Sequence, residues 1–569
     1  MRILLLGIVL AAISPGQITS SGQLEAARPN PPAPAESAPV KPEERCTIEG
    51  TVLNSVTGEP LKKAELMLRR ADPSPNGFGL SYAGASDAAG RFVIADIEPG
   101  RYRLGVQRAG FVNQQYGAKG PSSPGTVLTL AKSQKLKDLT FKLVPQAVIT
   151  GRVLDEDGDP VPNVSVQAMR SGYFRGKKQW LPAGVSTTND LGEYRIHGLA
   201  PGRYLLSAIY RPGGFMLEST QGGAAETYAP TYYPNAASPD SAAPLDVAAG
   251  AVLRDMDVRL QKTKTVHIRG RVLDPRTGKG ARTAMINLQP KSDTFLMFPR
   301  NMSRPYNDKG EFVISNVTPG SYILTASINE DGKMMSARIP VEIGNSSLED
   351  ITLQPAPGLE INGRVTIEGQ APEAKITNMR IYLQPRTPLM FGPGAQGGQV
   401  RDDNTFTLTN VQPEIYDVRT FGAPDGSYIK SIRVGDADVI DSGLDIATGA
   451  APGEMSVVIA MSAGQITGAV QNEKLEPAAG ATVVLIPEGK RRESDRWYQT
   501  TSTDQYGNYT LKNIAPGEYR VYAFDTVEFQ AYMDPEWLKP FETKGEKVSI
   551  EENAKPSVQL RLIPTQGQQ

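Results

Sequence analysis

The segment Pro99-Gly100-Arg101-Tyr102 decides the fold, because the pattern Pro-Gly-x-Tyr returns several times along the chain. Proline followed by glycine marks a turn, and the tyrosine opens an alternating apolar segment typical of a half-buried strand. The other copies are Pro201-Gly202-Arg203-Tyr204, Pro319-Gly320-Ser321-Tyr322 and Pro516-Gly517-Glu518-Tyr519, with a degenerate copy at Pro413-Glu414-Ile415-Tyr416.

A second pattern, Ile-x-Gly-x-Val, precedes each copy at a nearly constant distance. From its glycine to the proline of the first pattern the gaps are 49, 50, 49, 50 and 48 residues. Such regular spacing identifies a five-fold tandem repeat. The five copies of this signature are Ile48–Val52, Ile149–Val153, Ile268–Val272, Ile361–Val365 and Ile466–Val470.

Each repeat predicts the same order of strands. The signature strand leads through a hairpin turn to a second alternating strand, and a variable loop then precedes an Asp/Asn-x-x-Gly turn that ends in an aromatic residue. The Pro-Gly-x-Tyr strand and a closing strand follow. Because the signature glycine has no side chain, we expect a bulky residue over it, and in the second repeat we expect Tyr204 to pack across Gly151. The fourth repeat lacks the turn glycine and is expected to be the least regular.

The N-terminal region predicts export. Arg2 precedes eleven apolar residues, Ile3 to Ile13, which are too few to span a bilayer as a helix, so residues 1–22 are predicted to be a signal peptide. Residues 23–45 form a proline-rich linker. The formal net charge of −1 gives no electrostatic reason to expect nucleic acid as a partner. The single cysteine, Cys46, cannot form an intrachain disulfide, so each module must be held by its core.

The combined motifs resemble the carboxypeptidase regulatory-like domain. Its relatives include the transthyretin-like, collagen-adhesin B-type and starch-binding-like sandwiches, and tandem copies behind a signal peptide look like secreted proteins of Acidobacteria. The resemblance covers residues 46–563 and implies an all-β fold, a tandem array of five prealbumin-like Greek-key β-sandwich domains. The predicted domains are residues 46–145, 146–263, 264–355, 356–463 and 464–569.

The family name suggests a peptidase, but the residues do not. The only histidines, His197 and His267, lack the His-x-x-Glu spacing of a zinc carboxypeptidase, and no Gly-x-Ser-x-Gly segment is present. The acidic segment Asp155–Asp159 is followed at once by proline and is interpreted as a hairpin turn rather than a calcium loop. We therefore predict no enzymatic activity, no metal and no cofactor.

Aromatic residues supply the candidate binding site. Every repeat has an aromatic residue 28 or 29 positions after its signature glycine: Phe78, Trp180, Phe298, Phe391 and Trp497. Such residues stack on sugar rings or on a peptide, or fold back to cap their own sandwich, and both alternatives stay open. The candidate ligand-binding residues are Trp180, Tyr228, Tyr232, Tyr233, Trp497 and Trp537.

These observations favour a non-catalytic exported protein for structural spacing, display or adhesion at the cell envelope. The alternative is a carbohydrate-binding protein that uses the loop aromatics, and a peptidase ranks last. The partners considered are a polysaccharide or another envelope protein. The expected location is the periplasm, the cell surface or the medium.

Overall fold

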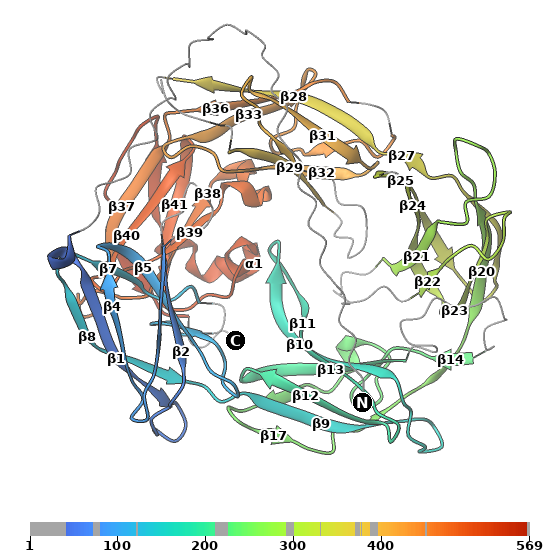
Figure 1. Cartoon of the computed structure of the whole chain (residues 1–569), viewed down its shortest axis with the longest axis horizontal. Coiled ribbons are helices and arrows are strands. Elements are labelled where there is room, and N and C mark those ends of the chain that lie inside the picture. Colours follow the sequence, from blue (N-terminus) through green and yellow to red (C-terminus); the bar gives the residue numbers. More distant parts are fainter. Residues whose placement is uncertain are drawn as a thin grey trace, which may run out of the picture. The chain divides into compact units, whose positions relative to one another are not determined.

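The computed structural model describes residues 41–71, 80–120, 123–210, 226–291, 301–330, 332–369, 376, 378–386, 397–449 and 452–565. The predicted signal peptide and most of the linker lie outside these residues. The described strands fall into five groups, here called modules 1 to 5, which share one pairing scheme (Figure 1). In modules 1 to 4 two sheets face each other across a core of alternating inward side chains, as expected for β-sandwiches. In module 5 the closing strand joins the two layers into one seven-stranded sheet. The predicted all-β, multi-domain fold is confirmed, and the domain boundaries stay a prediction.

The first sheet of each module is built around the signature strand. These central strands are β1 (Cys46–Asn54), β9 (Ala147–Leu154), β20 (Val266–Val272), β28 (Leu359–Glu368) and β37 (Gly464–Gln471). Each pairs antiparallel with the strand that follows the Asp/Asn turn: β4 (Arg91–Ile97), β12 (Glu193–Leu199), β23 (Glu311–Val317), β31 (Thr405–Val411) and β40 (Asn508–Ile514).

On its other side the signature strand pairs in parallel with the closing strand of the same module. The closing strands are β8 (Lys135–Leu143), β17 (Val252–Leu253) with β18 (Val258–Arg259), β26 (Leu348–Leu353), β36 (Met455–Ala460) and β43 (Leu560–Ile563). This parallel pairing connects the first and the last strand of each repeat by backbone hydrogen bonds.

The second sheet has the hairpin strand at its centre. These strands are β2 (Glu65–Arg70), β10 (Val164–Phe174), β21 (Met285–Pro290), β29 (Arg380–Pro385) and β38 (Thr482–Pro487). One antiparallel neighbour carries the repeated tyrosine: β5 (Gly100–Gln107), β13 (Gly202–Tyr210), β24 (Gly320–Glu330), β32 (Ile415–Phe421) and β41 (Gly517–Phe524). The other follows the variable loop: β3 (Ser81–Ala85), β11 (Lys177–Thr187), β22 (Asn301–Ser303), β30 (Gly398–Gln399) and β39 (Gln499–Ser502).

Additional elements decorate the tyrosine and closing strands and differ between modules. The additional strands are β6 (Gln114–Gln115), β7 (Val127–Leu130), β14 (Glu226–Tyr228), β15 (Thr231–Tyr232), β16 (Leu245–Val247), β19 (Lys262–Lys264), β25 (Lys333–Ile343), β27 (Ala356–Pro357), β33 (Tyr428–Val434), β34 (Ala437–Asp438), β35 (Leu444–Asp445) and β42 (Glu546–Ile550). The helical elements are η1 (Pro42–Glu44), η2 (Pro239–Ser241), η3 (Gly489–Glu493), η4 (Asp495–Trp497), η5 (Ala531–Met533), α1 (Pro535–Leu538) and η6 (Lys539–Lys544).

The signature glycine is covered, but not by the residue expected. The three atoms nearest to a Cβ built on Gly151 all belong to the Met256 backbone, with the carbonyl oxygen at 2.4 Å. The aromatic opposite Gly151 across the ladder is Tyr194, whose hydroxyl donates to that same oxygen. The expectation that Tyr204 packs across Gly151 is therefore wrong. Tyr194 and the backbone of Met256, between the two closing strands of module 2, occupy this position.

The repeated tyrosine fixes the turn before its own strand in each module. Its hydroxyl donates to the backbone carbonyl four residues earlier, a corner device known from β-sandwiches. The five bonds are Tyr102 to Glu98 (2.8 Å), Tyr204 to Ala200 (2.6 Å), Tyr322 to Thr318 (2.8 Å), Tyr416 to Gln412 (2.9 Å) and Tyr519 to Ala515 (2.9 Å). All five rings are buried in the cores of their modules.

The turn before the middle strand also has one recurring construction. In module 2 the Asn189 side chain accepts backbone N–H groups from Leu191 (3.0 Å) and Glu193 (2.8 Å), and Gly192 adopts a positive φ of 68°. Module 4 lacks this glycine, and Asn404 takes the positive φ (63°) instead, as asparagine tolerates. Module 4 also differs in its first sheet, where β33 pairs with the closing strand β36 and β34 pairs with β33, so its irregularity is not limited to the turn.

Candidate functional site

The predicted aromatic residues of module 2 lie in two different packing environments. Tyr232 is 6% exposed and belongs to a small cluster with Met169 and Leu205 on the outer face of the second sheet, against which Trp180 packs. Tyr228 stacks edge-on against Tyr210 at 5.2 Å between ring centroids. Tyr228 and Tyr233 both pack against the main core of the module as partly buried residues. The insertion therefore covers the sandwich instead of projecting a row of exposed rings.

The predicted tryptophans of module 5 are also engaged. Trp497 is 8% exposed, its indole Nε1 donates to Asp441 of module 4 at 2.5 Å, and the Arg491 guanidinium lies 4.3 Å from its ring centroid. Trp537 on α1 packs against Phe524 (5.3 Å) and Phe541 (5.1 Å).

The structure does not bring the six candidates into one site. Three further loop aromatics, Phe78, Phe298 and Phe391, lie outside the described residues. A ligand-binding role for the six stays a prediction, which Trp180→Ala tests: the contacts above predict a loss of stability, and a binding role predicts a loss of glycan retention.

A groove on module 1 is a better-formed site than the six candidate aromatics, and it was not predicted from the sequence. Its volume is about 930 Å³, in the range of small-ligand sites. The floor is the outer face of the second sheet, where side chains of neighbouring strands stand in rows fixed by the register. The middle row is Ala83, Met67, Gly105 and Gln115 across β3, β2, β5 and β6.

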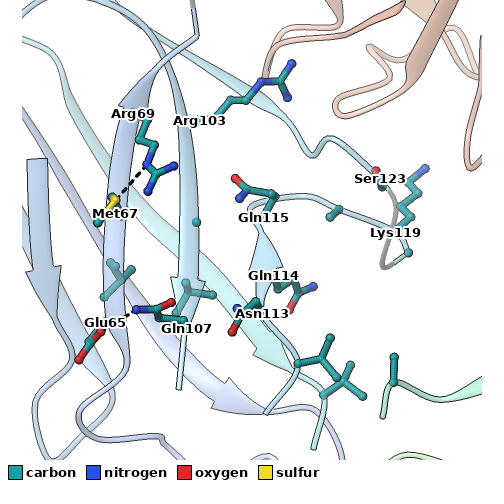
Figure 2. A pocket seen from close by; sticks show the side chains of 18 of the residues that line it. Glu65, Met67, Arg69, Arg103, Gln107, Asn113, Gln114, Gln115, Lys119 and Ser123 are labelled. Carbon is teal, nitrogen blue, oxygen red and sulfur yellow. Dashed lines mark hydrogen bonds between the residues drawn. The ribbon is translucent and has the colours of Figure 1, made fainter. Parts of the chain in front are cut away.

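The rows on either side carry polar groups. Arg69 stands opposite Arg103, and Glu65 stands opposite Gln107. The Gln107 amide donates to the Glu65 carboxylate at 2.8 Å. The segment after β5 contributes Asn113, Gln114, Gln115, Lys119 and Ser123 to the groove (Figure 2). Ala200 and Pro201 of module 2 also line it.

The floor is flat in the middle because Gly105 has no side chain. A Cβ at this position would meet the Gln115 amide nitrogen at 2.9 Å, so the glycine leaves room for Gln115 to lie over the sheet. The Gln114 Oε1 is buried, and no hydrogen-bond donor among the described residues reaches it. A ligand hydroxyl or N–H group would satisfy this acceptor, whose isolation otherwise costs about 1–3 kcal/mol.

The charges in the groove are mostly positive. Four lining residues are cationic, Arg69, Arg70, Arg103 and Lys119, against the one carboxylate of Glu65. Arg103 is fixed by donating to the carbonyls of Pro124 (2.5 Å) and Gly125 (3.3 Å). Partial burial, and to a smaller extent the neighbouring Arg101, lower the pKa of Arg103.

Arg69 is the exposed cation of the floor. Its Nε contacts the Met67 sulfur at 3.0 Å, and within the described part of the chain its two terminal nitrogens have no hydrogen-bond or ion-pair partner. A signal for this site existed in the sequence: β2 and β5 alternate apolar inward residues with Met67, Arg69, Arg103 and Gly105 outward. The strand register that aligns them could not be deduced.

Other reactive side chains have ordinary surroundings. His197 is exposed on β12, and the His267 imidazole pairs with Glu349 at 2.7 Å. Asp155 accepts backbone N–H groups from Asp157 (3.0 Å) and Asp159 (2.8 Å), which confirms the hairpin-turn interpretation. Cys46 is buried and donates to the Ala131 carbonyl at 3.0 Å. Among the described residues no three His, Cys, Asp or Glu side chains are grouped as a metal ion would need.

Comparison with known families supports the first two modules most directly. Residues 47–144 and 148–237 match the carboxypeptidase regulatory-like domain. Residues 464–531 match the second β-sandwich domain of proteins similar to the BOS complex subunit NOMO1. The resemblance inferred from the motifs is thus confirmed, as two copies in tandem plus a related sandwich. The search of curated proteins gives no significant match.

Solved structures with partial similarity include pilins. A streptococcal ancillary pilin is 12% identical, with 55% of this chain and 100% of the pilin covered and a TM-score of 0.19. GBS52, a minor pilin of Streptococcus agalactiae, is 12% identical over 39% of this chain and 96% of its own length, with a TM-score of 0.22. Such low scores carry no argument about function. In the described residues no helix is long and apolar enough to cross a membrane.

Proposed function

We propose that the chain is an exported, non-catalytic protein whose β-sandwich modules serve structural spacing, display or adhesion at the cell envelope. One observation supports this most strongly. The polar residues that recur from module to module, the turn Asp or Asn and the corner tyrosine, bond to the backbone of their own module. The repeated chemistry therefore maintains the fold, as a spacer or display protein needs.

The contact between modules 4 and 5 supports a mechanical role. Asp495 pairs with Arg419, the Arg496 guanidinium donates to the Val418 carbonyl, and Trp497 bonds Asp441. Partial burial, and then Arg419, lower the pKa of Arg496. Such charge-assisted bonds restrict movement of one module against the next. The partners that fit this role are another envelope protein or a polysaccharide.

Fractionation of cells tests the proposed export. The full chain and a variant without residues 1–22, both with a C-terminal epitope, are expressed in a bacterium that has an outer membrane. The full chain is expected in the periplasm, on the surface or in the medium, with its N-terminus cleaved near residue 22. An uncleaved full chain that stays in the cytoplasm like the variant would contradict the proposal.

An activity assay tests the non-catalytic part. The purified full chain is incubated with unfolded peptides and with polysaccharides, with and without a chelator. We expect no hydrolysis. Turnover that increases with protein concentration and disappears on chelation would overturn this part of the proposal and favour a peptidase.

A further inference from the structure

We infer that the groove of module 1 binds an acidic polysaccharide, with Arg69 as the residue that recognises its carboxylates. Leu66 and Val106, which also line the groove, belong to the core of the module, but the repeated fold does not require its polar groups, because Arg69, Arg103 and Gln107 stand outside that core. The inference rests on the proposed export, since such polymers are found outside the cytoplasm.

The charge of the groove selects an anion. Arg69, Arg70, Arg103 and Lys119 outnumber the single carboxylate, which already accepts a hydrogen bond from Gln107. The Arg69 guanidinium stands in the row beside Met67, with its terminal nitrogens unpaired among the described residues (Figure 2). A planar guanidinium forms two parallel hydrogen bonds with a carboxylate, which makes Arg69 the natural anchor.

The remaining lining groups select hydroxyls rather than a peptide side chain. Asn113, Gln114, Gln115 and Gln107 offer amide donors and acceptors, which match hydroxyl groups that are themselves donors and acceptors. A bound peptide would need pockets for its side chains. The apolar side chains of this sheet, such as Leu66 and Val106, are buried in the core, and the floor offers only the low surface of Ala83, Met67 and Gly105.

The shape of the groove agrees with a polymer of linked rings. The middle row is low at the small residues Ala83 and Gly105, which flank Met67, and β3 is the edge strand of this sheet. The Gln114 Oε1 beside this floor has no donor in the part of the chain that the structure describes, so a hydroxyl of the ligand would complete its hydrogen bonding.

The test uses the purified full chain and three probes in affinity electrophoresis and calorimetry. The probes are polygalacturonate, which carries a carboxylate on each ring, dextran, which is neutral, and poly-glutamate, an acidic peptide. We expect retention by polygalacturonate, weaker or no retention by the other two, and weaker binding at high salt.

Two groove variants and one matched control locate the site. Arg69→Gln removes the anchor, and Gly105→Leu fills the floor, where the nearest atom is the end of the flexible Gln115 side chain. Lys142→Gln removes the same charge from exposed β8 on the other sheet. Both groove variants should bind polygalacturonate at least about tenfold more weakly, Arg69→Gln because it loses the charge-assisted bond and Gly105→Leu because its side chain occupies the floor. The control should bind as the parent protein does.

Several results of these binding assays would overturn the inference. Equal loss for Lys142→Gln and Arg69→Gln would reduce the interaction to general charge and overturn the inference. So would preferred binding of poly-glutamate, equal retention by dextran or no binding of polygalacturonate by the parent protein. Circular dichroism and melting temperatures check that the variants stay folded. The binding assay does not depend on cell fractionation, so failure of this inference is separable from failure of the proposed export.

Discussion

Replacing the signature glycine by alanine should open the parallel pair that closes each module, and module 3 offers the cleanest case. A Cβ on Gly270 would lie 2.3 Å from the Ile351 carbonyl oxygen of β26 and 2.9 Å from the Phe312 ring. Cβ atoms in proteins essentially never come closer than 3.0 Å to such atoms, so β26 must move away by at least about 0.7 Å. That displacement stretches the backbone hydrogen bonds next to Ile351.

The expected cost of Gly270→Ala is about 1–3 kcal/mol, the usual range for inserting atoms into a packed interior. Alanine restricts the unfolded chain, which recovers only about 0.4–1 kcal/mol. Global unfolding of a five-module chain is not a two-state process, so the measurement must be local. Hydrogen exchange with mass spectrometry on peptides covering residues 348–353 should show exchange about tenfold faster or more, and peptides from module 5 should not change.

Gly344→Ala is the matched control in the same module. This glycine is exposed, and a Cβ built on it has no atom within 4 Å. Its exchange should stay the same or slow slightly. Phe312→Leu added to Gly270→Ala should restore only part of the protection, because the contact with the Ile351 backbone remains. Unchanged exchange in Gly270→Ala would refute the argument that close backbone approach explains this glycine.

Three further perturbations test other parts of the structure. Tyr204→Phe removes the donor of the 2.6 Å bond to the Ala200 carbonyl and should destabilise module 2 by about 1–2 kcal/mol in local exchange, whereas an unchanged value would mean that water replaces the bond. Gln167→Met should stabilise the same module by about 1–2 kcal/mol in the same assay, since both amide atoms of this residue are buried without partners among the described residues; a loss of stability would show an ordered water there. Burial raises the pKa of Tyr204, Tyr416 and Tyr519 above the ordinary value of 10.0. The unfolded chain therefore loses these protons at a lower pH than the folded chain does, so the stability of the fold must fall as the pH rises above 10. Phenolate absorbance that appears before unfolding would contradict this.

The repeat, the fold and the turns could be predicted because local chemistry determines them. Positive φ demands glycine or asparagine, an Asp or Asn side chain accepts the N–H groups of its own turn, and strands alternate inward and outward residues. Each of these constraints acts within a few residues, so it is visible in one repeat and is confirmed by the others. The parallel pairing of first and closing strands was not visible, since it depends on residues about ninety positions apart.

The partner of the signature glycine shows the same limit. Sequence alternation correctly placed a bulky group over it, but the choice between Tyr204 and Tyr194 depends on which strand pairs with β9. The candidate aromatics show another limit. The spacing of the repeat placed Trp497 in a variable loop, but its indole donates a hydrogen bond to Asp441 in the preceding module. Contacts between modules do not recur from repeat to repeat, so the repeat pattern cannot reveal them.

The outer face of the second sheet explains how one repeated sandwich can take different roles. In modules 2 and 5 the central strands β10 and β38 are buried on both faces over Val164–Met169 and Thr482–Pro487. In module 2, Tyr232 and Trp180 pack on Met169 and Leu205 of this face. In module 5, Leu538 and Phe541 belong to one cluster with Tyr522 and Phe524 of this face.

In module 1 the corresponding strand β2 alternates, with Leu66 and Leu68 buried and Met67 and Arg69 exposed. A strand that is apolar on both faces must be covered by other residues of the protein, whereas an alternating strand leaves one face open to solvent. Covering groups in modules 2 and 5 make this face part of the structure. The open, cationic face of module 1 is therefore where selection for a ligand can act without cost to the core.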